Sequence, residues 1–331
     1  MNITTKDIAK ICGVSRGTVD RALHNKPGIN QLTRDRILRV IGELHYRPHH
    51  LARSLVKGQT YTIGVIVWNL YHRYFSQLVH SIEKASREHG YGILLAISDR
   101  DPDREFTCLD QLAGRQMDGI IIMSVNKGQQ FEQYLKSLNI PIVTIGNKIS
   151  NYWPYIGIND RGAMREAVYF LKNKGYTHIK YISPPLALRN RKNMNLYTWE
   201  ERLKGYKDAY SELFADNKPI VIKTENYAKL IEEIELQPNQ KQALLFSSDL
   251  YALEALNQLK KQNFKVPKEI GIMGFDNIDI LKYISPSLTT VEYPVMEIGR
   301  EAINCLINLI KTRVSLKKII LNHKIIEGET V

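Results

Sequence analysis

Apolar residues in the first 45 positions recur at helical spacing in three short groups. Thr4 and Asp7 match a capping box, in which both side chains pair with free backbone N–H groups, so we expect a helix to begin after Thr4. Ser15 is a suitable N-cap for a second helix over Arg16–His24, and Asn30 for a third. Two short helices joined by a tight turn that contains glycine are typical of a helix-turn-helix motif.

From Tyr61 onward the period of the apolar pattern changes, because short apolar runs alternate with longer amphipathic segments. Repeated strand–helix units imply parallel sheets covered by helices. The units restart after Asp160, so we predict an α/β fold in which an all-α helix-turn-helix domain precedes two lobes of doubly wound parallel sheet. The predicted strands cover 63–67, 93–96, 119–123, 142–145, 178–182, 220–222, 243–246 and 270–273, and the predicted helices cover 75–90, 162–174, 201–213, 227–235 and 250–262.

Positive charge is concentrated at the start of the chain. The first 58 residues hold 11 Lys and Arg against 4 Asp and Glu, whereas the rest of the chain holds 35 against 30. An excess of positive charge on a short helical segment is the electrostatic footprint of a nucleic-acid binder.

The composition argues against several other classes of protein. No apolar run approaches the roughly 20 residues that a membrane span needs, and the N-terminus has no apolar stretch of the signal-peptide kind, so we expect a cytoplasmic protein with no membrane partner. Cys12, Cys108 and Cys305 lack the spacing of a zinc site or a disulfide frame. We therefore predict free thiols and neither a metal nor a cofactor.

The second helix carries the residues best suited to reading DNA. Its outward positions include Arg16, Gly17, Thr18 and Arg21. Arg suits guanine, whose O6 and N7 accept its paired donors. Glycine inside a helix costs roughly 1 kcal/mol against alanine, and a close approach to DNA is one reason to keep it. An ordinary three-helix bundle with a solvated basic face is the alternative interpretation.

The segment TTKDIAKICGVSRGTVDRALHNKPGINQLTRDRILRVIGELHYRPHHLARSL closely resembles the head of the LacI/GalR family of transcription repressors. The resemblance implies a DNA-binding domain over 1–58 with a hinge helix at about 48–56. It implies that Leu55 is a wedge in the minor groove, where the alternative is a linker residue packed on its neighbours. The implied base-reading residues are Arg16, Gly17 and Arg21, the implied phosphate-contacting or capping residues are Thr5, Ser15, Thr18 and Asn25, and the hinge contacts are Leu51, Ala52 and Leu55.

Aromatic and amide side chains follow several predicted strands of the long part, at the edge where open α/β sheets bind ligands. Trp68, Asn69 and Tyr71 follow the first strand, and Gly146-Asn147 follows a later one. Aromatic faces with a few carboxylate and amide groups suit a sugar. Trp68 and Tyr71 have a second interpretation, as aromatics that only pack the lobes together.

The segments FSSDLYALEAL and GIMGFDNIDILKYISPSLTTVEYPVMEIG resemble the core of the same family, which is similar to a periplasmic sugar-binding protein. The resemblance implies an effector-binding and dimerisation domain over 59–331, with an N-lobe of 60–160 and 292–322 and a C-lobe of 161–291 and 323–331. Two of the residues that the resemblance implies for effector binding have another interpretation. Arg202 could instead form a surface salt bridge with Glu200 or Glu201, and Asp276 could instead cap a loop or a helix. The implied effector-binding residues are Tyr74, Phe75, Asn147, Thr198, Arg202, Tyr227, Ser248, Asp249 and Asp276.

Three features depart from the family pattern. Asp20 stands where Ser is usual, and a carboxylate near phosphates is unfavourable unless it is paired, with Arg16 or Arg21 as candidates. Gly146 stands where an Asp that binds hydroxyls is frequent. The loop from Ser183 to Tyr197 is longer than usual and carries Arg189, Arg191 and Lys192, which form either a solvated cluster or a site for an anionic effector such as a sugar phosphate.

The resemblance thus implies a repressor of carbohydrate-utilisation genes: a homodimer on double-stranded palindromic operator DNA, whose affinity is changed by a sugar or sugar-phosphate effector. The alternative is a solute-binding sensor with non-specific DNA anchoring. Walker, G-x-G-x-x-G, H-E-x-x-H and G-x-S-x-G motifs do not occur, which argues against an enzyme. A transport-binding protein would need an export signal, and a DNA-packaging protein would not need the cleft. The effector, the operator and the direction of the response do not follow from the sequence.

Overall fold

The computed structural model describes residues 3–46, 58–185, 194–215, 217–235, 240–314 and 318–331. The chain divides into two compact units, Met1–Thr60 and Tyr61–Val331, which we call the head and the core. In the described part of the chain, no helix combines the length and apolar character needed to cross a membrane.

The head contains three helices, α1 (Thr5–Ile11), α2 (Arg16–Leu23) and α3 (Gln31–Glu43). Their apolar faces meet in a small core of buried side chains. The predicted capping box is present, since the Thr4 hydroxyl accepts from the Asp7 N–H at 3.3 Å and the Asp7 carboxylate accepts from the Thr4 N–H at 2.9 Å. The buried side chains of the head are Ile8, Ala9, Cys12, Val19, Ala22 and Ile37.

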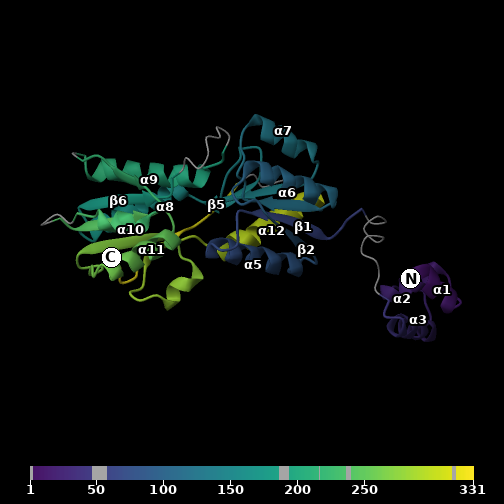
Figure 1. Cartoon of the computed structure of the whole chain (residues 1–331). Coiled ribbons are helices and arrows are strands. Elements are labelled where there is room, and N and C mark those ends of the chain that lie inside the picture. The colour runs from purple at the N-terminus through teal and green to yellow at the C-terminus, as the bar shows by residue number, and fades with distance from the viewer. Residues whose placement is uncertain (1–2, 47–57, 186–193, 216, 236–239, 315–317) are drawn as a thin grey trace. The chain divides into compact units, whose positions relative to one another are not determined.

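The core contains two six-stranded sheets, each covered by helices (Figure 1). The first sheet has the order β11-β5-β4-β3-β1-β2, and all its pairings are parallel. Strands β1, β3, β4 and β5 are almost wholly buried apolar runs, as expected of strands covered on both faces, whereas the edge strand β11 is partly exposed. They are β1 (Thr62–Val67), β2 (Gly92–Ile97), β3 (Gly119–Ile122), β4 (Ile142–Ile145), β5 (Tyr155–Ile158) and β11 (Lys318–Leu321).

The second sheet has the order β12-β10-β9-β8-β6-β7. It is parallel except at its edge, where β12 pairs antiparallel to β10. Its strands are β6 (His178–Ser183), β7 (Ile220–Lys223), β8 (Gln242–Phe246), β9 (Ile270–Asp276), β10 (Thr289–Glu292) and β12 (Lys324–Ile326).

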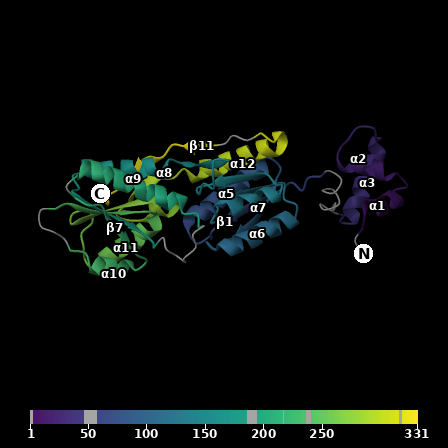
Figure 2. The same ribbon diagram turned by 90° about the horizontal axis from the view of Figure 1, so that it is seen from above.

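Each sheet, together with the helices that pack on it, forms one lobe of the core. The N-lobe is the first sheet with its helices, of which α5 and α12 lie side by side in both views (Figure 1, Figure 2). The C-lobe is the second sheet with its helices, of which α8 packs along α9. The N-lobe helices are α5 (Arg73–Glu88), α6 (Pro102–Gly114), α7 (Gln129–Ser137) and α12 (Val295–Thr312), and those of the C-lobe are α8 (Asp160–Asn173), α9 (Tyr197–Leu213), α10 (Tyr227–Glu232), α11 (Asp249–Lys261) and the 3₁₀ helix η1 (Asp279–Tyr283).

The described chain passes between the lobes at three places: from β5 to α8, from β10 to α12, and from β11 to β12. Such a three-strand connection permits a hinge motion of one lobe against the other. The apolar period did not predict helices α6, α7 and α12 or strands β5, β10, β11 and β12. Strands β10, β11 and β12 each include a charged residue, so they lack the uncharged, mostly apolar run of the short strands β3 and β4.

Candidate functional site

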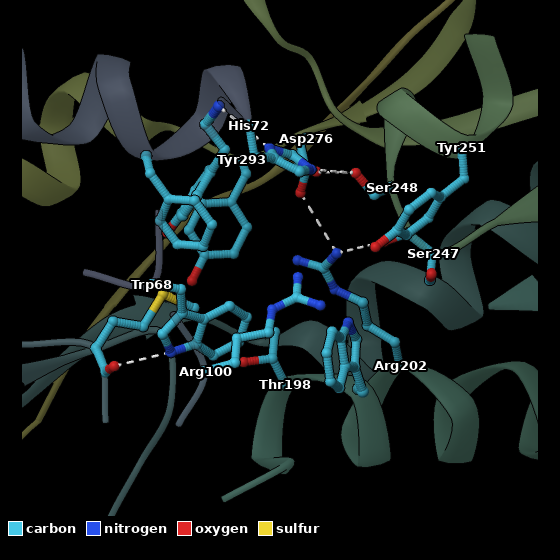
Figure 3. A pocket seen from close by; sticks show the side chains of 14 residues that line it. Trp68, His72, Arg100, Thr198, Arg202, Ser247, Ser248, Tyr251, Asp276 and Tyr293 are labelled. Carbon is cyan, nitrogen blue, oxygen red and sulfur yellow. Dashed lines mark hydrogen bonds and ion pairs between the residues drawn. The ribbon is translucent and has the colours of Figure 1, made fainter. Parts of the chain in front are cut away.

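A cavity lies between the two lobes of the core, at the carboxyl ends of the strands. Its walls combine aromatic side chains with a few polar groups (Figure 3), as is usual in sites for small molecules. The N-lobe contributes Trp68, His72, Tyr74, Phe75, Arg100 and Met123, the C-lobe contributes Thr198, Trp199, Arg202, Ser247, Ser248, Tyr251 and Asp276, and Tyr293 lies where β10 leads into α12.

Arg202 is the centre of the polar wall. Its side chain comes from α9, is 5% exposed, and donates to Asp160 at 2.8 Å, to the Ser247 carbonyl at 2.7 Å and to Asp276 at 3.4 Å. Its guanidinium also lies over the Phe275 ring, 3.7 Å from the centroid. Burial alone would lower the pKa of Arg202, but the two carboxylates outweigh it and the net shift is upward. Arg202 therefore stays positively charged, and its three hydrogen-bond partners fix the orientation of the guanidinium.

Asp276 links this cation to the N-lobe. It lies at the end of β9, and its carboxylate accepts from the Ser248 hydroxyl at 2.8 Å. Ser248 is in turn 2.9 Å from Nε2 of His72, which precedes α5. Because the single hydroxyl proton of Ser248 goes to Asp276, Nε2 of His72 must carry the proton of the second bond. A continuous chain of polar contacts thus crosses from Arg202 to His72.

His72 is held in its neutral form. Nδ1 accepts from the Tyr74 N–H at 3.4 Å and caps α5, which leaves Nε2 as the donor. Burial lowers the pKa of His72, although Asp276 acts in the opposite direction. The chain of contacts therefore depends on one tautomer of one imidazole.

Three buried hydroxyls of the wall have no hydrogen-bond partner among the described residues: those of Tyr74, Tyr293 and Ser247. A buried hydroxyl without a partner costs free energy comparable to a lost hydrogen bond. The cavity therefore offers free donors and acceptors next to a fixed cation and a fixed carboxylate, which suits a ligand with several hydroxyls.

A second candidate site lies on α2 of the head. Arg16, Gly17 and Arg21 are exposed there, while Val19 and Ala22 on the other face are buried. A Cβ atom built at Gly17 would meet only the Ser15 hydroxyl, at 3.7 Å, which is an ordinary contact. Nothing within the described head therefore requires glycine at this position.

The neighbouring polar residues shape the start and end of α2. Ser15 accepts from the Thr18 N–H at 3.1 Å, and the hydroxyls of these two residues are 2.9 Å apart. Asp20, which replaces the usual Ser, accepts from Lys26 at 2.9 Å and is 3.0 Å from His24. Its charge is thus balanced by residues at the end of the helix.

Comparisons with known proteins match both parts of the chain. The model of bacterial regulatory proteins of the lacI family matches residues 4–49, and that of the periplasmic binding protein-like domain matches residues 168–331. Catabolite control protein A of Priestia megaterium is 31% identical over 312 residues, which cover 92% of this chain and 92% of that protein. The chain belongs to the lacI family. It is thus a DNA-binding transcription regulator, and the predicted family is confirmed.

Two solved structures show the same architecture as this lacI-family chain. The lac repressor dimer bound to operator and the anti-inducer ONPF has a TM-score of 0.85 at 20% identity, over 100% of this chain and 99% of that one, which is a likeness of fold. A periplasmic binding protein/LacI transcriptional regulator from Alkaliphilus metalliredigens QYMF, complexed with D-xylulofuranose, has a TM-score of 0.69 at 26% identity, over 81% of this chain and 98% of that one. The predicted fold class is confirmed.

Six of the nine residues that the family resemblance implied for the effector line the cavity. Arg202 pairs with buried carboxylates in place of the alternative partners Glu200 and Glu201. Trp68 lines the cavity, whereas Tyr71 is 83% exposed. The six are Tyr74, Phe75, Thr198, Arg202, Ser248 and Asp276.

Asn147 lies behind the cavity wall and joins the lobes. Its Oδ1 accepts from the N–H and the hydroxyl of Thr198, at 3.1 and 2.6 Å, and its Nδ2 donates to the carbonyls of Ser124 and Asn195, at 3.0 and 2.9 Å. The side-chain amide therefore has its full set of four hydrogen bonds. The preceding Gly146 has φ of +63°, a left-handed conformation that strains other residues, and a Cβ there would lie 2.8 Å from the terminal methyl of Met123, which would have to move to admit the Asp frequent in the family.

Asp249 and Tyr227 also lie outside the lining. Asp249 is fully buried, accepts from the Ile278 N–H at 2.9 Å and from the Thr290 hydroxyl at 2.5 Å, and thereby ties together the loops after two strands. Burial raises the pKa of Asp249 to about 7, and the nearby Asp276 acts in the same direction. Tyr227 stacks on Tyr251, which does line the cavity, with 5.7 Å between the ring centroids.

Sequence reasoning missed several lining residues. His72 and Arg100 follow strands of the N-lobe at the edge where ligands are expected, so their position was the available signal. Trp199 precedes Arg202 by one turn of α9 and shares its face. Met123, Ser247 and Tyr293 directly follow strands β3, β8 and β10, which is the same signal. The missed residues are His72, Arg100, Met123, Trp199, Ser247, Tyr251 and Tyr293.

Several predictions concern residues outside those described: the hinge helix at about 48–56 with Leu51, Ala52 and Leu55, and the cluster Arg189, Arg191 and Lys192. Cys12, Cys108 and Cys305 are buried and do not form disulfides with one another. Within the described ranges, no group of three or more His, Cys, Asp or Glu side chains could hold a metal ion.

Proposed function

We propose that this protein is a repressor of carbohydrate-utilisation genes that binds palindromic operator DNA as a homodimer and responds to a sugar or sugar-phosphate effector. The observation that carries the proposal is the cavity wall, in which a fixed cation, a shared carboxylate and three unpartnered hydroxyls face a space between two hinged lobes. The D-xylulofuranose complex of a similar chain supports a sugar as the ligand.

The proposed roles follow from the chemistry of the wall. Arg202 and Asp276 bind ligand hydroxyls from the C-lobe, as donor and acceptor, while Ser248 and Thr198 add shorter polar contacts. The rings of Tyr74 and Phe75 pack edge to face, with centroids 5.2 Å apart, and supply an apolar surface for the C–H face of a sugar. Asn147, Tyr227 and Asp249 support these residues from behind.

On the head, we propose that α2 lies in the major groove with Arg16, Gly17 and Arg21 at base edges. Gly17 fits this role because the fold itself does not require it. Thr5, Ser15, Thr18 and Asn25 contact phosphates or cap the helices. Leu51, Ala52 and Leu55 contact the minor groove, with Leu55 as the wedge. We place the protein and its DNA target in the cytoplasm.

The dimer follows from the spacing of the DNA grooves. Two recognition helices about 34–36 Å apart read two half-sites, so a palindrome mirrors the two-fold symmetry of the protein. The lac repressor dimer bound to operator, which has the same fold, supports this arrangement. Closure of the lobes on a ligand then changes the separation of the two heads and thereby the operator affinity.

Catalysis is not part of the proposal. His72 and Ser248 are in contact, but the Ser248 proton points to Asp276 and His72 is the donor of the pair. In a catalytic triad the imidazole accepts the hydroxyl proton and the carboxylate orients the imidazole. Here the direction of both hydrogen bonds is reversed, because Ser248 donates to the carboxylate and the imidazole donates to Ser248. Ser248 is therefore a weak nucleophile, and the arrangement suits the binding of a ligand.

Selection of duplex DNA from a randomised pool by the purified chain, at near-physiological salt, tests the proposal. We expect enrichment of a palindrome with a flexible centre, because two heads and two wedges act together. Recovery of salt-sensitive, sequence-independent binding would favour the alternative, a solute-binding sensor with non-specific DNA anchoring.

A further inference from the structure

Arg100 fills the aromatic part of the cavity. Its guanidinium lies 4.8 Å from the ring centroid of Trp68, which belongs to the N-lobe, and 4.8 Å from that of Trp199, which belongs to the C-lobe. The two indole rings are themselves only 5.6 Å apart. Arg100 thus lies against both indole rings, on the side where a sugar ring would otherwise contact them, and Figure 3 shows it in the cavity near Trp68.

The backbone that carries Arg100 adopts a strained conformation. Arg100 and the preceding Asp99 both have positive φ, +56° and +49°, in the turn between β2 and α6. Left-handed backbone is uncommon for residues other than glycine, and strain of this kind tends to occur at functional sites. The turn therefore holds Arg100 towards the cavity at the carboxyl end of β2.

Arg100 differs from Arg202 in how it is held. Arg202 forms ion pairs with two carboxylates, whereas Arg100 has no ion pair with any carboxylate in the part of the chain that the structure describes. Its buried Nε has no hydrogen-bond partner within the same ranges. Among the described residues, Arg100 is thus a cation of the wall with no carboxylate partner, held by ring contacts and by a hydrogen bond to Tyr251.

The space on the two sides of Arg100 is unequal. The cavity that the proposed effector residues line has about 50 Å³ of free space, whereas an outer chamber beside it has about 410 Å³. His72, Arg100 and Tyr251 separate the two, and Asn69, Tyr71, Asp99 and Leu250 complete the outer chamber. Sites for small molecules usually measure about 300–1,000 Å³, so a ligand must displace part of the wall before it fits the inner cavity.

Arg100 is the part of the wall that can yield. His72, Ser248, Asp276 and Arg202 are bound to one another in the continuous chain of contacts described above. Displacing any of them breaks hydrogen bonds between buried groups, which is costly. Displacing Arg100 breaks two ring contacts and one hydrogen bond to the half-buried Tyr251, and it moves a half-buried charge towards the solvent of the outer chamber.

We propose that Arg100 is a gate and a specificity determinant of this site, and that the ligand is a monosaccharide carrying an anionic group, either a phosphate or a carboxylate. This inference rests on the proposed sugar-responsive function. The sugar ring takes the place of the guanidinium against Trp68 and Trp199, and Arg100 turns into the outer chamber and pairs with the anionic group. A guanidinium without a carboxylate partner is suited to such a group, because it forms two parallel hydrogen bonds with it.

The chain supplies its own reporter for this exchange. It has three tryptophans, and two of them, Trp68 and Trp199, contact Arg100. Replacing a cation by a ligand against both indole rings changes their fluorescence. Tryptophan emission of the full-length protein can therefore be titrated with glucose, glucose 6-phosphate, glucuronate, ribose and ribose 5-phosphate, with calorimetry as a second measurement.

The quantity to measure is the affinity for the anionic sugar divided by the affinity for its neutral parent. We expect the wild-type ratio to favour the anionic sugar by about 10-fold or more and to fall as salt rises. Arg100→Ala should bring the ratio close to one and leave the neutral sugar bound at least as tightly. Arg100→Lys, which keeps the charge, should give an intermediate ratio. Arg165→Ala is the matched control, since Arg165 pairs with Glu212 on the surface of the C-lobe.

The outcomes separate this inference from the function on which it rests. A ratio that Arg100→Ala and Arg100→Lys leave unchanged, or sugars of both classes binding equally well to the wild type, would overturn the role of Arg100 and leave the sugar-responsive function intact. Failure of all five sugars to bind a protein that selects an operator would overturn the sugar ligand itself, and the role of Arg100 with it.

Discussion

The head and the core carry their candidate sites in opposite ways. On the head, Arg16, Gly17 and Arg21 are exposed, and the fold uses other residues of α2 for its packing. In the core, Arg202 and Asp276 are 5% and 6% exposed and are bound to their neighbours. The surface site is separable from folding, while the buried site is part of what holds the lobes in place.

This difference has a physical origin. DNA is a large, charged partner that a small domain can meet only with its surface. A small ligand is recognised by surrounding it, so its partners are buried before it arrives. Buried charges need countercharges, which ties the ligand site to the stability of the core. Substitutions in the two regions should therefore differ in whether they change the free energy of unfolding.

The largest effect is expected for Arg202→Ala. The substitution leaves Asp160 and Asp276 buried without their countercharge, which should lower the free energy of unfolding of the core by about 3–5 kcal/mol. Urea unfolding followed by tryptophan fluorescence measures this change, and Arg165→Ala, which removes an exposed ion pair, is the control. A loss no greater than that of the control would show that the network does not stabilise the core.

The same variant should respond to pH. Burial raises the pKa of Asp160 to about 6 even with Arg202 present, and removing Arg202 removes an influence that lowers it. A folded-state pKa above the unfolded value makes the free energy of unfolding larger at low pH and smaller as pH rises through the folded-state pKa. Arg202→Ala should therefore be less destabilised at pH 5 than at pH 8. Equal destabilisation at both would contradict the assignment.

Arg16→Ala is expected to show the opposite behaviour on the head. The exposed side chain contributes little to folding, so the melting of the head should not change measurably. Affinity for the selected operator should fall by about 1–3 kcal/mol, while affinity for random DNA should fall less. Fluorescence anisotropy with both duplexes measures the two values. Equal losses on both would assign Arg16 to the phosphates.

Asn147→Ala tests the connection between the lobes. The amide makes four hydrogen bonds, three of them to C-lobe residues Thr198 and Asn195, and its loss leaves their buried groups unpaired. We expect a loss of about 1–3 kcal/mol in unfolding free energy and weaker ligand binding, although Asn147 does not line the cavity. Calorimetry with the ligand tests this, and an unchanged affinity would show that closure does not depend on this amide.

Gly17→Ala should give a small change in stability, in the opposite direction to Arg202→Ala and Asn147→Ala. Alanine favours a helix over glycine by roughly 1 kcal/mol, and the added methyl group meets free space within the head. The head should become slightly more stable and yet bind the operator less tightly. Stabilisation with full operator affinity would mean that DNA does not approach this residue closely.

The head could be predicted from the sequence because its signals are local. The cap at Thr4, the N-caps Ser15 and Asn30, and the apolar spacing in each helix all act within one or two turns. The structure places the helices where these signals predicted them. Asp20 stands where the family usually has Ser. Its carboxylate pairs with Lys26 and lies next to His24, both of which follow the end of α2, and the sequence predicted neither partner.

In the core, the sequence predicted the alternation of strands and helices, but it predicted the roles of the site residues less well. Asn147 was expected at the ligand because it follows a strand, but the amide is used between the lobes. The contact between Arg100 and Trp199 was not predicted, because it joins residues of the two lobes and local spacing does not show such a contact. Short edge strands such as β12 likewise depend on the partner strand β10, far away in the sequence.

The central claim is that the exposed site on the head and the buried site in the core are linked. The most direct test measures operator affinity with and without the bound sugar ligand, and ligand affinity with and without operator, on the same dimeric protein. The account requires the two ratios to be equal, at about 5–150-fold. A ligand that binds the cavity and leaves operator affinity unchanged would contradict it.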